Sequence, residues 1–369
     1  MSQKEIYKIA LFLPGFGNGG AERVFIKLLY YLKSRGHKVD LIVASKKGDL
    51  VDRLDDDVIY LGSRYSLTSF SKYTRYIRDE SPDIVMATLF GAIVVSGITK
   101  MLGFTGNTQL ICRIANITHK PRGIFQLTKY LLERIALNQA DGVITNSNAT
   151  LDSIEDLLEK EQNRNIVTIS NPVLDDDYQK RIRDCSDIKR VRDIVIIGRF
   201  VPQKQISHAI KAFSIIKKTV TDARLIIVGD GPESEEIMNM INERNLRSEV
   251  KIIKYHDDIP SLLMSSKCMI NTSLFEGFGN IFIEGLAFCQ NIVCYKSIGG
   301  ASELLHNTNA ILIKQGDIDS LASEVSKLLL ADSERSVKDI DIGFLDQFTV
   351  SHIGRRYEDF ILNTLDRSS

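Results

Sequence analysis

The sequence predicts an α/β protein made of two doubly wound parallel-sheet domains, and three observations carry this prediction. The chain has 369 residues, whereas a single hydrophobic core stops growing at roughly 250–300 residues, so two domains are expected. Short apolar runs rich in β-branched residues alternate with amphipathic segments of helical spacing, a pattern typical of βαβ units. This alternation breaks once, at Asn171-Pro172, and then starts again.

In the first domain, over residues 1–172, six apolar runs are expected to form strands that are buried on both faces. They are Lys8–Leu13, Lys38–Ala44, Asp83–Ala87, Gln109–Ile114, Gly142–Thr145 and Ile166–Ser170. Ala21–Arg35 has apolar residues at helical spacing and predicts the first crossover helix. Residues 173–190, which include three consecutive aspartates and a basic cluster, are expected to link the domains.

The second domain, over residues 191–349, repeats the same alternation of elements. Strands are expected at Asp193–Ile197, Arg224–Val228, Val250–Tyr255, Cys268–Asn271 and Ile292–Tyr295, and helices at Ile206–Lys218, Glu233–Arg244 and Asn280–Phe288. The amphipathic segment Val350–Leu365 predicts a closing helix that packs back onto the first domain. Two such domains, facing each other, would bind a ligand in the cleft at the carboxyl ends of their strands.

The composition is that of an ordinary globular protein, with 44% hydrophobic and 25% charged residues. Basic and acidic residues number 47 each, but the first 150 residues hold 20 Lys or Arg against 13 Asp or Glu. This excess is too small for a nucleic-acid-binding protein but suits an anionic partner. The five cysteines show no CxxC pairing, so we expect reduced thiols in a cytoplasmic protein. We expect neither a signal peptide nor a membrane-spanning helix.

A glycine-rich turn, Gly15–Gly20 (GFGNGG), follows the first predicted strand and opens the first helix. Its GxGxxG spacing lets the backbone approach a phosphate at a helix N-terminus. A dinucleotide site would also need an acidic residue after the second strand, where the sequence has Ser45–Lys47 (SKK). An NAD site is therefore disfavoured, while an NADP site, or a tight turn without any ligand, stays open.

Two glutamates bracket another glycine turn, in Phe275–Ala287 (FEGFGNIFIEGLA). Residues 281–288 are apolar almost all round, which indicates a buried helix that begins near Gly279. Because a carboxylate in such a helix needs a hydrogen-bonding partner, Glu284 is expected to face a ligand at the helix N-terminus, with Glu276 at the other end of that ligand. The alternative for Glu284 is an ion pair with a neighbouring basic side chain.

Two further turns follow strands of the second domain. In Gly198–Lys204 (GRFVPQK), Arg199 and Lys204 can reach the mouth of the turn, and arginine suits bidentate binding of phosphate oxygens. Val228–Pro232 (VGDGP) is the second turn. Together they predict a diphosphate clamp, although such a basic pair alone is usually a solvated surface.

These motifs together resemble those of retaining glycosyltransferases with the GT-B fold, in glycosyltransferase family 4 (glycosyl transferases group 1), which builds bacterial polysaccharides and glycolipids. The resemblance covers nearly the whole chain. It rests on Gly19–Arg23, Asn171-Pro172, Gly198–Lys204, Val228–Pro232, the pair Glu276 and Glu284, and Gly299-Gly300 with Glu303.

The resemblance implies that a sugar moves from a nucleotide-diphosphate sugar, UDP-linked rather than GDP-linked, to a hydroxyl of a glycan or lipid-linked oligosaccharide, with retention of anomeric configuration. The first domain would bind the acceptor and the second the donor, in cell-surface polysaccharide biosynthesis such as that of lipopolysaccharide or O-antigen. No cofactor or metal is expected, because fixed cations and helix N-termini would stabilise the leaving diphosphate.

The resemblance also implies roles for single residues. Arg199 and Lys204 would hold the diphosphate, Glu284 the ribose hydroxyls, and Glu276, as the catalytic residue, the hydroxyls of the transferred sugar. The residues expected to bind through their backbone are Gly277, Phe278, Gly279, Gly229, Gly19 and Gly20.

Three departures from the family pattern stand out. Gln205 replaces a glycine, which could alter the turn, and Phe288–Asn291 replaces a small-Gly-x-Pro block. The strand end Cys112–Asn116 lacks the usual histidine; His119 lies three residues later and is the candidate for a catalytic part, with an ordinary surface histidine as the alternative.

The segment Arg113–Arg134 interleaves basic and apolar residues. Such a surface suits peripheral contact with an anionic membrane, here the inner face of the plasma membrane; a helix packed on its own domain is the alternative. Two other functions stay open. One is a different GT-B sugar-nucleotide enzyme, such as an epimerase, and the other is a non-catalytic sugar-nucleotide-binding subunit.

Overall fold

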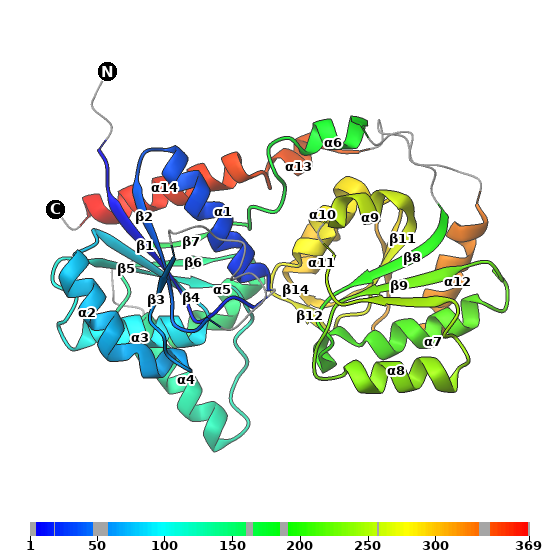
Figure 1. Cartoon of the computed structure of the whole chain (residues 1–369), viewed down its shortest axis with the longest axis horizontal. Coiled ribbons are helices and arrows are strands. Elements are labelled where there is room, and N and C mark those ends of the chain that lie inside the picture. The colour runs from blue at the N-terminus through cyan, green and yellow to red at the C-terminus, as the bar shows by residue number, and fades with distance from the viewer. Residues whose placement is uncertain are drawn as a thin grey trace. The chain divides into compact units, whose positions relative to one another are not determined.

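The computed structural model describes residues 5–17, 19–46, 58–159, 165–184, 191–256, 258–331 and 340–367. The chain divides into two compact units: unit 1 is Met1–Pro172 with Phe348–Ser369, and unit 2 is Val173–Gln347. Each unit is built on a parallel sheet with helices on both faces (Figure 1). Asn18 and Lys47 of the sequence motifs, and residues 185–190 of the expected linker, lie outside the described residues.

Unit 1 has, within its described residues, seven parallel strands in the order β3-β2-β1-β4-β5-β6-β7. They are β1 (Lys8–Leu13), β2 (Lys38–Val43), β3 (Val58–Tyr60), β4 (Ile84–Thr88), β5 (Gln109–Ile114), β6 (Gly142–Thr145) and β7 (Asn165–Thr168). The helices are α1 (Gly20–Ser34), α2 (Phe70–Glu80), α3 (Phe90–Met101), α4 (Ile124–Leu137), α5 (Asn148–Ile154) and α14 (Val350–Asp366), with the 3-10 turns η2 (Ser66–Ser69) and η3 (Glu155–Leu157).

The core of unit 1 lies on both faces of this sheet, as β1 illustrates. Leu11 packs in a cluster with residues of α1 and α14, whereas Phe12 packs in another with residues of α2, α3 and α4. The C-terminal helix α14 contributes Tyr357 to the first cluster. A strand covered on both sides reads as a continuous apolar run, which is why the sequence indicates β1 so plainly.

Arg113, at the carboxyl end of β5, is fully buried and joins three parts of unit 1. Its Nε donates to Tyr357 Oη (2.8 Å), its Nη2 to Asn171 Oδ1 (2.5 Å) and its Nη1 to Thr88 Oγ1 (3.3 Å). Asn171 lies next to the point where the chain leaves unit 1. The prediction that a basic surface begins at Arg113 is therefore wrong, because this guanidinium lies in the interior.

Unit 2 contains, in the part that the structure describes, a six-stranded parallel sheet in the order β10-β9-β8-β11-β13-β15. Its strands are β8 (Val191–Ile197), β9 (Arg224–Val228), β10 (Val250–Ile253), β11 (Ser266–Asn271), β13 (Ile292–Tyr295) and β15 (Ile311–Ile313). A separate pair is β12 (Phe275–Glu276) with β14 (Ile298–Gly299). The helices are α6 (Tyr178–Asp184), α7 (Ile206–Ile216), α8 (Ser234–Glu243), α9 (Ile259–Ser265), α10 (Asn280–Phe288), α11 (Gly300–Leu305), α12 (Ile318–Leu330) and α13 (Ile342–Asp346), with the 3-10 turn η4 (Pro202–Lys204).

The segment expected to be a linker holds helix α6, which is packed into unit 2. Tyr178 is 1% exposed, and its hydroxyl donates to Asp346 Oδ1 of α13 (2.8 Å). Residues 178–184 of the expected linker are therefore a helix that belongs to unit 2. A seven-residue helix with two buried side chains gives too short a pattern to recognise in a charged segment.

The strand order predicts a ligand site in each unit. In unit 2, β8 lies between β9 and β11. The next two strands in sequence, β9 and β10, lie on one side of β8, and the later strands β11, β13 and β15 lie on the other. In unit 1, β1 has the same position between β2 and β4. Open α/β sheets bind ligands outside the carboxyl ends of their strands at such a switch point. The glycine turns of the sequence analysis follow β1, β8 and β9.

Candidate active site

The turns that follow β8 and β9 pack backbone against backbone. Gly229 has φ +154°, and a Cβ at this position would lie 1.9 Å from the carbonyl oxygen of Gly198. Phe200 N donates to Asp230 O (2.9 Å) and holds the two turns together. The turn that carries Arg199 is thus fixed against a turn that only glycine can form at this distance. The Arg199 side chain is exposed and, within the described residues, makes no hydrogen bond or ion pair.

Lys204 ends the 3-10 turn η4, and the residue after it has a left-handed backbone. Gln205 has φ +46° and ψ +45°, the region that glycine adopts without strain. Its side-chain oxygen accepts from Gln315 Nε2 (2.7 Å). The glutamine that replaces the family's glycine therefore adopts a glycine-like conformation at an energetic cost, and it gains a partner from another part of unit 2.

The loop after β11 is bonded along its length to η4. Thr272 Oγ1 donates to the carbonyl oxygen of Lys204 (2.9 Å), and Leu274 N donates to Gln203 O (2.8 Å). Gln203 Nε2 donates to the carbonyl oxygen of Phe275 (2.7 Å). These bonds bring two segments that are far apart in the sequence into one site.

Lys204 and Glu276, the predicted phosphate-binding and sugar-binding residues, contact each other. Lys204 Nζ lies 2.5 Å from Glu276 Oε1, and the side chains are 16% and 9% exposed. Ser273 Oγ donates to the same oxygen (2.8 Å) and is buried. Ser273 was missed by the sequence analysis; its only signal is a small polar residue three positions before a motif glutamate.

Helix α10 begins directly after this cluster. Gly279 precedes it with φ +84°, and a Cβ there would lie 2.7 Å from the Phe282 ring. Gly277, Phe278 and Gly279 thus connect Glu276 to the positive end of the helix dipole, which favours an anion. Glu284 lies in the second turn of α10 and is half-buried. The structure therefore joins Lys204, Glu276 and the α10 N-terminus into one chemical site.

In unit 1, a carboxylate lies over the first glycine turn. Glu22, 9% exposed, is in the first turn of α1, and its Oε2 lies 2.5 Å from where a Cβ on Gly19 would be. A carboxylate at a helix N-terminus interacts favourably with the dipole. A phosphate that approached Gly19 and Gly20 would have to move Glu22, because both groups are negative.

His119 lies in the loop between β5 and α4, at the same edge of the sheet as the turn after β1. Its side chain is exposed. The structure shows its position and exposure only, and the catalytic part of His119 stays a prediction.

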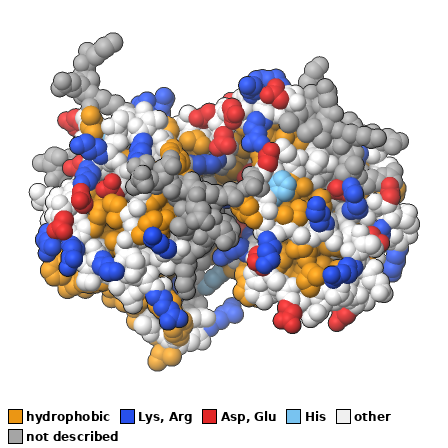
Figure 2. Space-filling model, in the orientation of Figure 1, with side chains coloured by type: hydrophobic (Ala, Val, Ile, Leu, Met, Phe, Trp, Pro, Cys, Tyr) orange, Lys and Arg blue, Asp and Glu red, His pale blue; other side chains and the backbone are white. Residues whose placement is uncertain are grey.

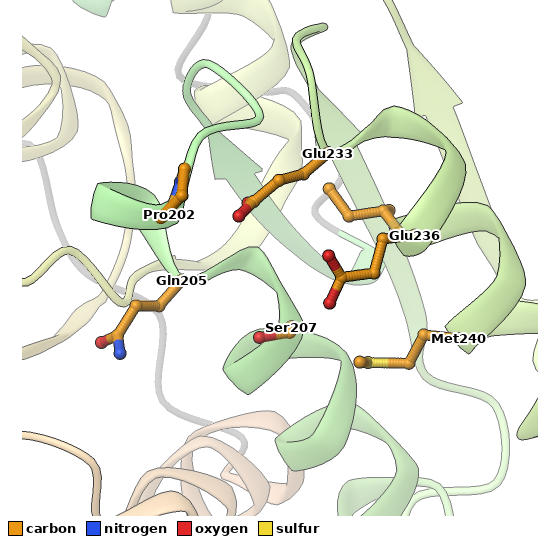
Figure 3. A pocket seen from close by; sticks show the side chains of 7 residues that line it. Pro202, Gln205, Ser207, Glu233, Glu236 and Met240 are labelled. Carbon is orange, nitrogen blue, oxygen red and sulfur yellow. The ribbon is translucent and has the colours of Figure 1, made fainter.

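A pocket of about 160 Å³ lies beside η4 and the start of α8 (Figure 3). Its lining residues are Pro202, Gln205, Ser207, Glu233, Glu236, Ile237 and Met240. Burial and the neighbouring Glu236 carboxylate raise the pKa of Glu233. Two carboxylates disfavour a phosphate, and none of the predicted donor-binding residues lines this pocket, so we do not assign the donor to it.

Comparison with known proteins identifies the family. The family Glycosyltransferase Family 4 matches residues 18–176, and the family Glycosyl transferases group 1 matches residues 179–339.

The chain is a family 4 glycosyltransferase.

Relatives resemble this glycosyltransferase over nearly its whole length. The N-acetylgalactosamine-N,N'-diacetylbacillosaminyl-diphospho-undecaprenol 4-alpha-N-acetylgalactosaminyltransferase of Campylobacter jejuni is 23% identical over 342 residues, 89% of this chain and 91% of the relative. HepE of Anabaena, solved with UDP-glucose, has a TM-score of 0.78 at 20% identity, and the match covers 98% of this chain and 100% of HepE. The pneumococcal O-GlcNAc transferase GtfA, solved with UDP and GlcNAc, has a TM-score of 0.76 at 10% identity, with coverage of 98% and 100%. The fold is GT-B, as the sequence predicted.

No group of three or more His, Cys, Asp or Glu side chains among the described residues could hold a metal ion. None of the helices they form is both long and apolar enough to cross a bilayer.

Proposed function

We propose that this glycosyltransferase moves a sugar from a UDP-sugar, in preference to a GDP-sugar, to a hydroxyl of a lipid-linked oligosaccharide, with retention and without a metal ion. The observation that carries the proposal is the cluster of Lys204 and Glu276 at the N-terminus of α10. Support for the substrates comes from the Anabaena and pneumococcal proteins, which were solved with UDP, and from the Campylobacter enzyme, whose name specifies a diphospho-undecaprenol acceptor.

In this proposal each group of the site has a separate task. Arg199, Lys204 and the α10 N-terminus neutralise the diphosphate as it leaves, since positive groups fixed in place stabilise developing negative charge without reorganisation. Glu276 accepts from hydroxyls of the transferred sugar, and Glu284 accepts from the ribose hydroxyls. Unit 1 holds the acceptor, for the synthesis of a cell-surface polysaccharide such as lipopolysaccharide.

A panel of nucleotide sugars tests the donor. At 100 times its dissociation constant, the correct donor is expected to stabilise the folded protein by about 2.7 kcal/mol, measured as a rise in the thermal midpoint. UDP should raise the midpoint more than UMP, because the cationic site requires the diphosphate. Equal shifts with UDP and UMP, or a response to GDP-sugars alone, would contradict the donor assignment. Turnover in the presence of EDTA would support transfer without a metal ion. A product that keeps the donor's anomeric configuration, determined by NMR, would support retention.

We further propose that unit 1 attaches the enzyme to the inner, anionic face of the plasma membrane through the tip of α4. Ile124 and Phe125, in the first turn of α4, are 85% and 84% exposed. Further exposed apolar side chains on this helix are Leu127, Leu131 and Ile135, and the exposed basic ones at or beside it are Arg122, Lys129 and Arg134. Hydrophobic and basic side chains gather at this tip in Figure 2.

A second exposed element, the 3-10 turn η2, contacts the same helix as α4 does. A Cβ on Gly91 of α3 would lie 2.6 Å from Ser66 Oγ, and Lys129 Nζ lies 4.8 Å from the centre of the Phe90 ring, so η2 and α4 each contact the start of α3. Tyr65 is 59% exposed there. An apolar surface bordered by cations suits an anionic bilayer better than water or a neutral partner.

Vesicle co-sedimentation tests this surface. Replacing Ile124 and Phe125 by serine is expected to lower binding to phosphatidylglycerol vesicles about tenfold or more, because each apolar side chain loses roughly 1–3 kcal/mol of burial. The matched control replaces Leu102 and Phe104, which are 50% and 51% exposed beyond the other end of α3, and should bind like the unmodified protein. Equal loss in both variants, or no binding by the unmodified protein at low salt, would refute the attachment.

A further inference from the structure

The Glu276 carboxylate is held through one of its two oxygens. Lys204 Nζ and Ser273 Oγ both contact Oε1, at 2.5 Å and 2.8 Å. A carboxylate has about four acceptor positions, so Oε2 keeps its capacity to accept from a ligand. The pair of contacts therefore fixes which oxygen points away from the protein partners.

Ser273 is more deeply buried than Lys204 and Glu276, the other two members of this cluster. It is 1% exposed, and its backbone N–H donates to Asn271 Oδ1 (3.0 Å) at the end of β11. The adjoining Thr272 bonds to the carbonyl oxygens of both Lys204 and Gln205, at 2.9 Å each. The backbone that carries the Ser273 hydroxyl is thus bonded to the carboxyl end of β11.

The two partners of Oε1 respond differently to a bound diphosphate. The difference rests on the proposed function, in which Lys204 turns toward the diphosphate. An ammonium group on a four-carbon stem follows the stronger negative charge, so its hold on Glu276 weakens at the moment when the sugar must be positioned. The serine hydroxyl is neutral and stays.

We propose that Ser273 is a positioning residue for Glu276, which keeps Oε2 directed at the hydroxyls of the transferred sugar after the donor diphosphate has drawn Lys204 away. Its effect is on the rate of transfer and not on the affinity for UDP, because UDP lacks the sugar that Glu276 contacts.

Threonine and valine at position 273 test this role, since they have the same shape and differ in the hydroxyl. The expected result is a kcat for Ser273→Val that is about 10- to 100-fold below that of Ser273→Thr, the size of effect that a small misplacement of a reacting group produces. The dissociation constant for UDP is expected to be the same in both variants. Ser273→Ala, which removes a single atom and adds no strain, should show the same loss of kcat relative to the unmodified enzyme.

Ser266 provides a matched control at the other end of β11. It is fully buried and donates to Leu262 O (2.8 Å), so Ser266→Ala removes an equivalent hydrogen bond away from the site. It should lower the thermal midpoint without changing kcat. Equal kcat in the threonine and valine variants, or an unmodified kcat in Ser273→Ala, would overturn the role of Ser273. If Glu276→Ala also retained its kcat, the role of Glu276 would fail together with that of Ser273, whereas an unmodified enzyme that transfers no sugar from any UDP-sugar would refute the proposed function itself, so the failures are distinguishable.

Discussion

Replacement of Glu276 by alanine is expected to lower the rate of sugar transfer on the order of 100- to 1,000-fold, the loss produced when a fixed group that stabilises the transition state is removed. Two effects act together. The sugar hydroxyls lose their acceptor, and Lys204 loses the partner that lies 2.5 Å away. The measurement is single-turnover transfer with a saturating UDP-sugar, which separates the chemical step from donor binding.

An exposed glutamate outside the site serves as the control for Glu276. Glu235, in the first turn of α8, is exposed and belongs to no part of the site, so Glu235→Ala should transfer sugar at the unmodified rate. Glu276→Gln keeps the shape of the side chain and one oxygen but loses the charge, and an intermediate rate is expected. Near-normal transfer by Glu276→Ala would remove Glu276 from the mechanism.

Gly229→Ala is expected to lower the free energy of unfolding of unit 2 by about 4 kcal/mol or more, which combines overpacking with backbone strain. The new Cβ would lie 1.9 Å from the carbonyl oxygen of Gly198, so one of the two turns has to shift. The shift would act on the bonds from Gly198 N to Val228 O (3.0 Å) and from Phe200 N to Asp230 O (2.9 Å). Urea unfolding, followed for the transition of unit 2, gives the measurement.

Gly316 allows the backbone strain in Gly229→Ala to be separated from the overpacking. It also has a positive φ, +81°, but a Cβ there would have no atom within 4 Å. Gly316→Ala therefore carries backbone strain without a clash and is expected to cost roughly 1–2 kcal/mol. If both alanine variants lost the same stability, the close packing of the β8 and β9 turns would not matter energetically.

The strands that the sequence predicted well are those buried on both faces. Lys8–Leu13, Gln109–Ile114 and Arg224–Val228 have the predicted bounds because continuous apolar runs end there at turn residues. Val58–Tyr60 and Ile311–Ile313 were not predicted. They are three residues long and mostly half-buried at the sheet edges, so their sequence carries too little apolar signal.

The sequence predicted which residues belong to the site but not which of them contact each other. The sequence assigned Lys204 to the phosphate and Glu276 to the sugar from separate motifs. Their contact spans 72 residues and depends on the bonds between η4 and the loop after β11, which no local pattern encodes. Ser273 was missed for the same reason, because a lone serine acquires meaning only when the fold places a carboxylate beside it.

The bonds of Arg113 to Asn171 and Tyr357 bear on the order in which the chain folds. Unit 2 is continuous in sequence, so all of its residues are synthesised before those of α14. Until then Arg113 is a cation facing an incomplete interior, since Tyr357 is not yet present to accept from its Nε. A buried charge without its partners is costly, so we expect unit 1 to complete its core only after α14 has been synthesised, although its first residue is made first.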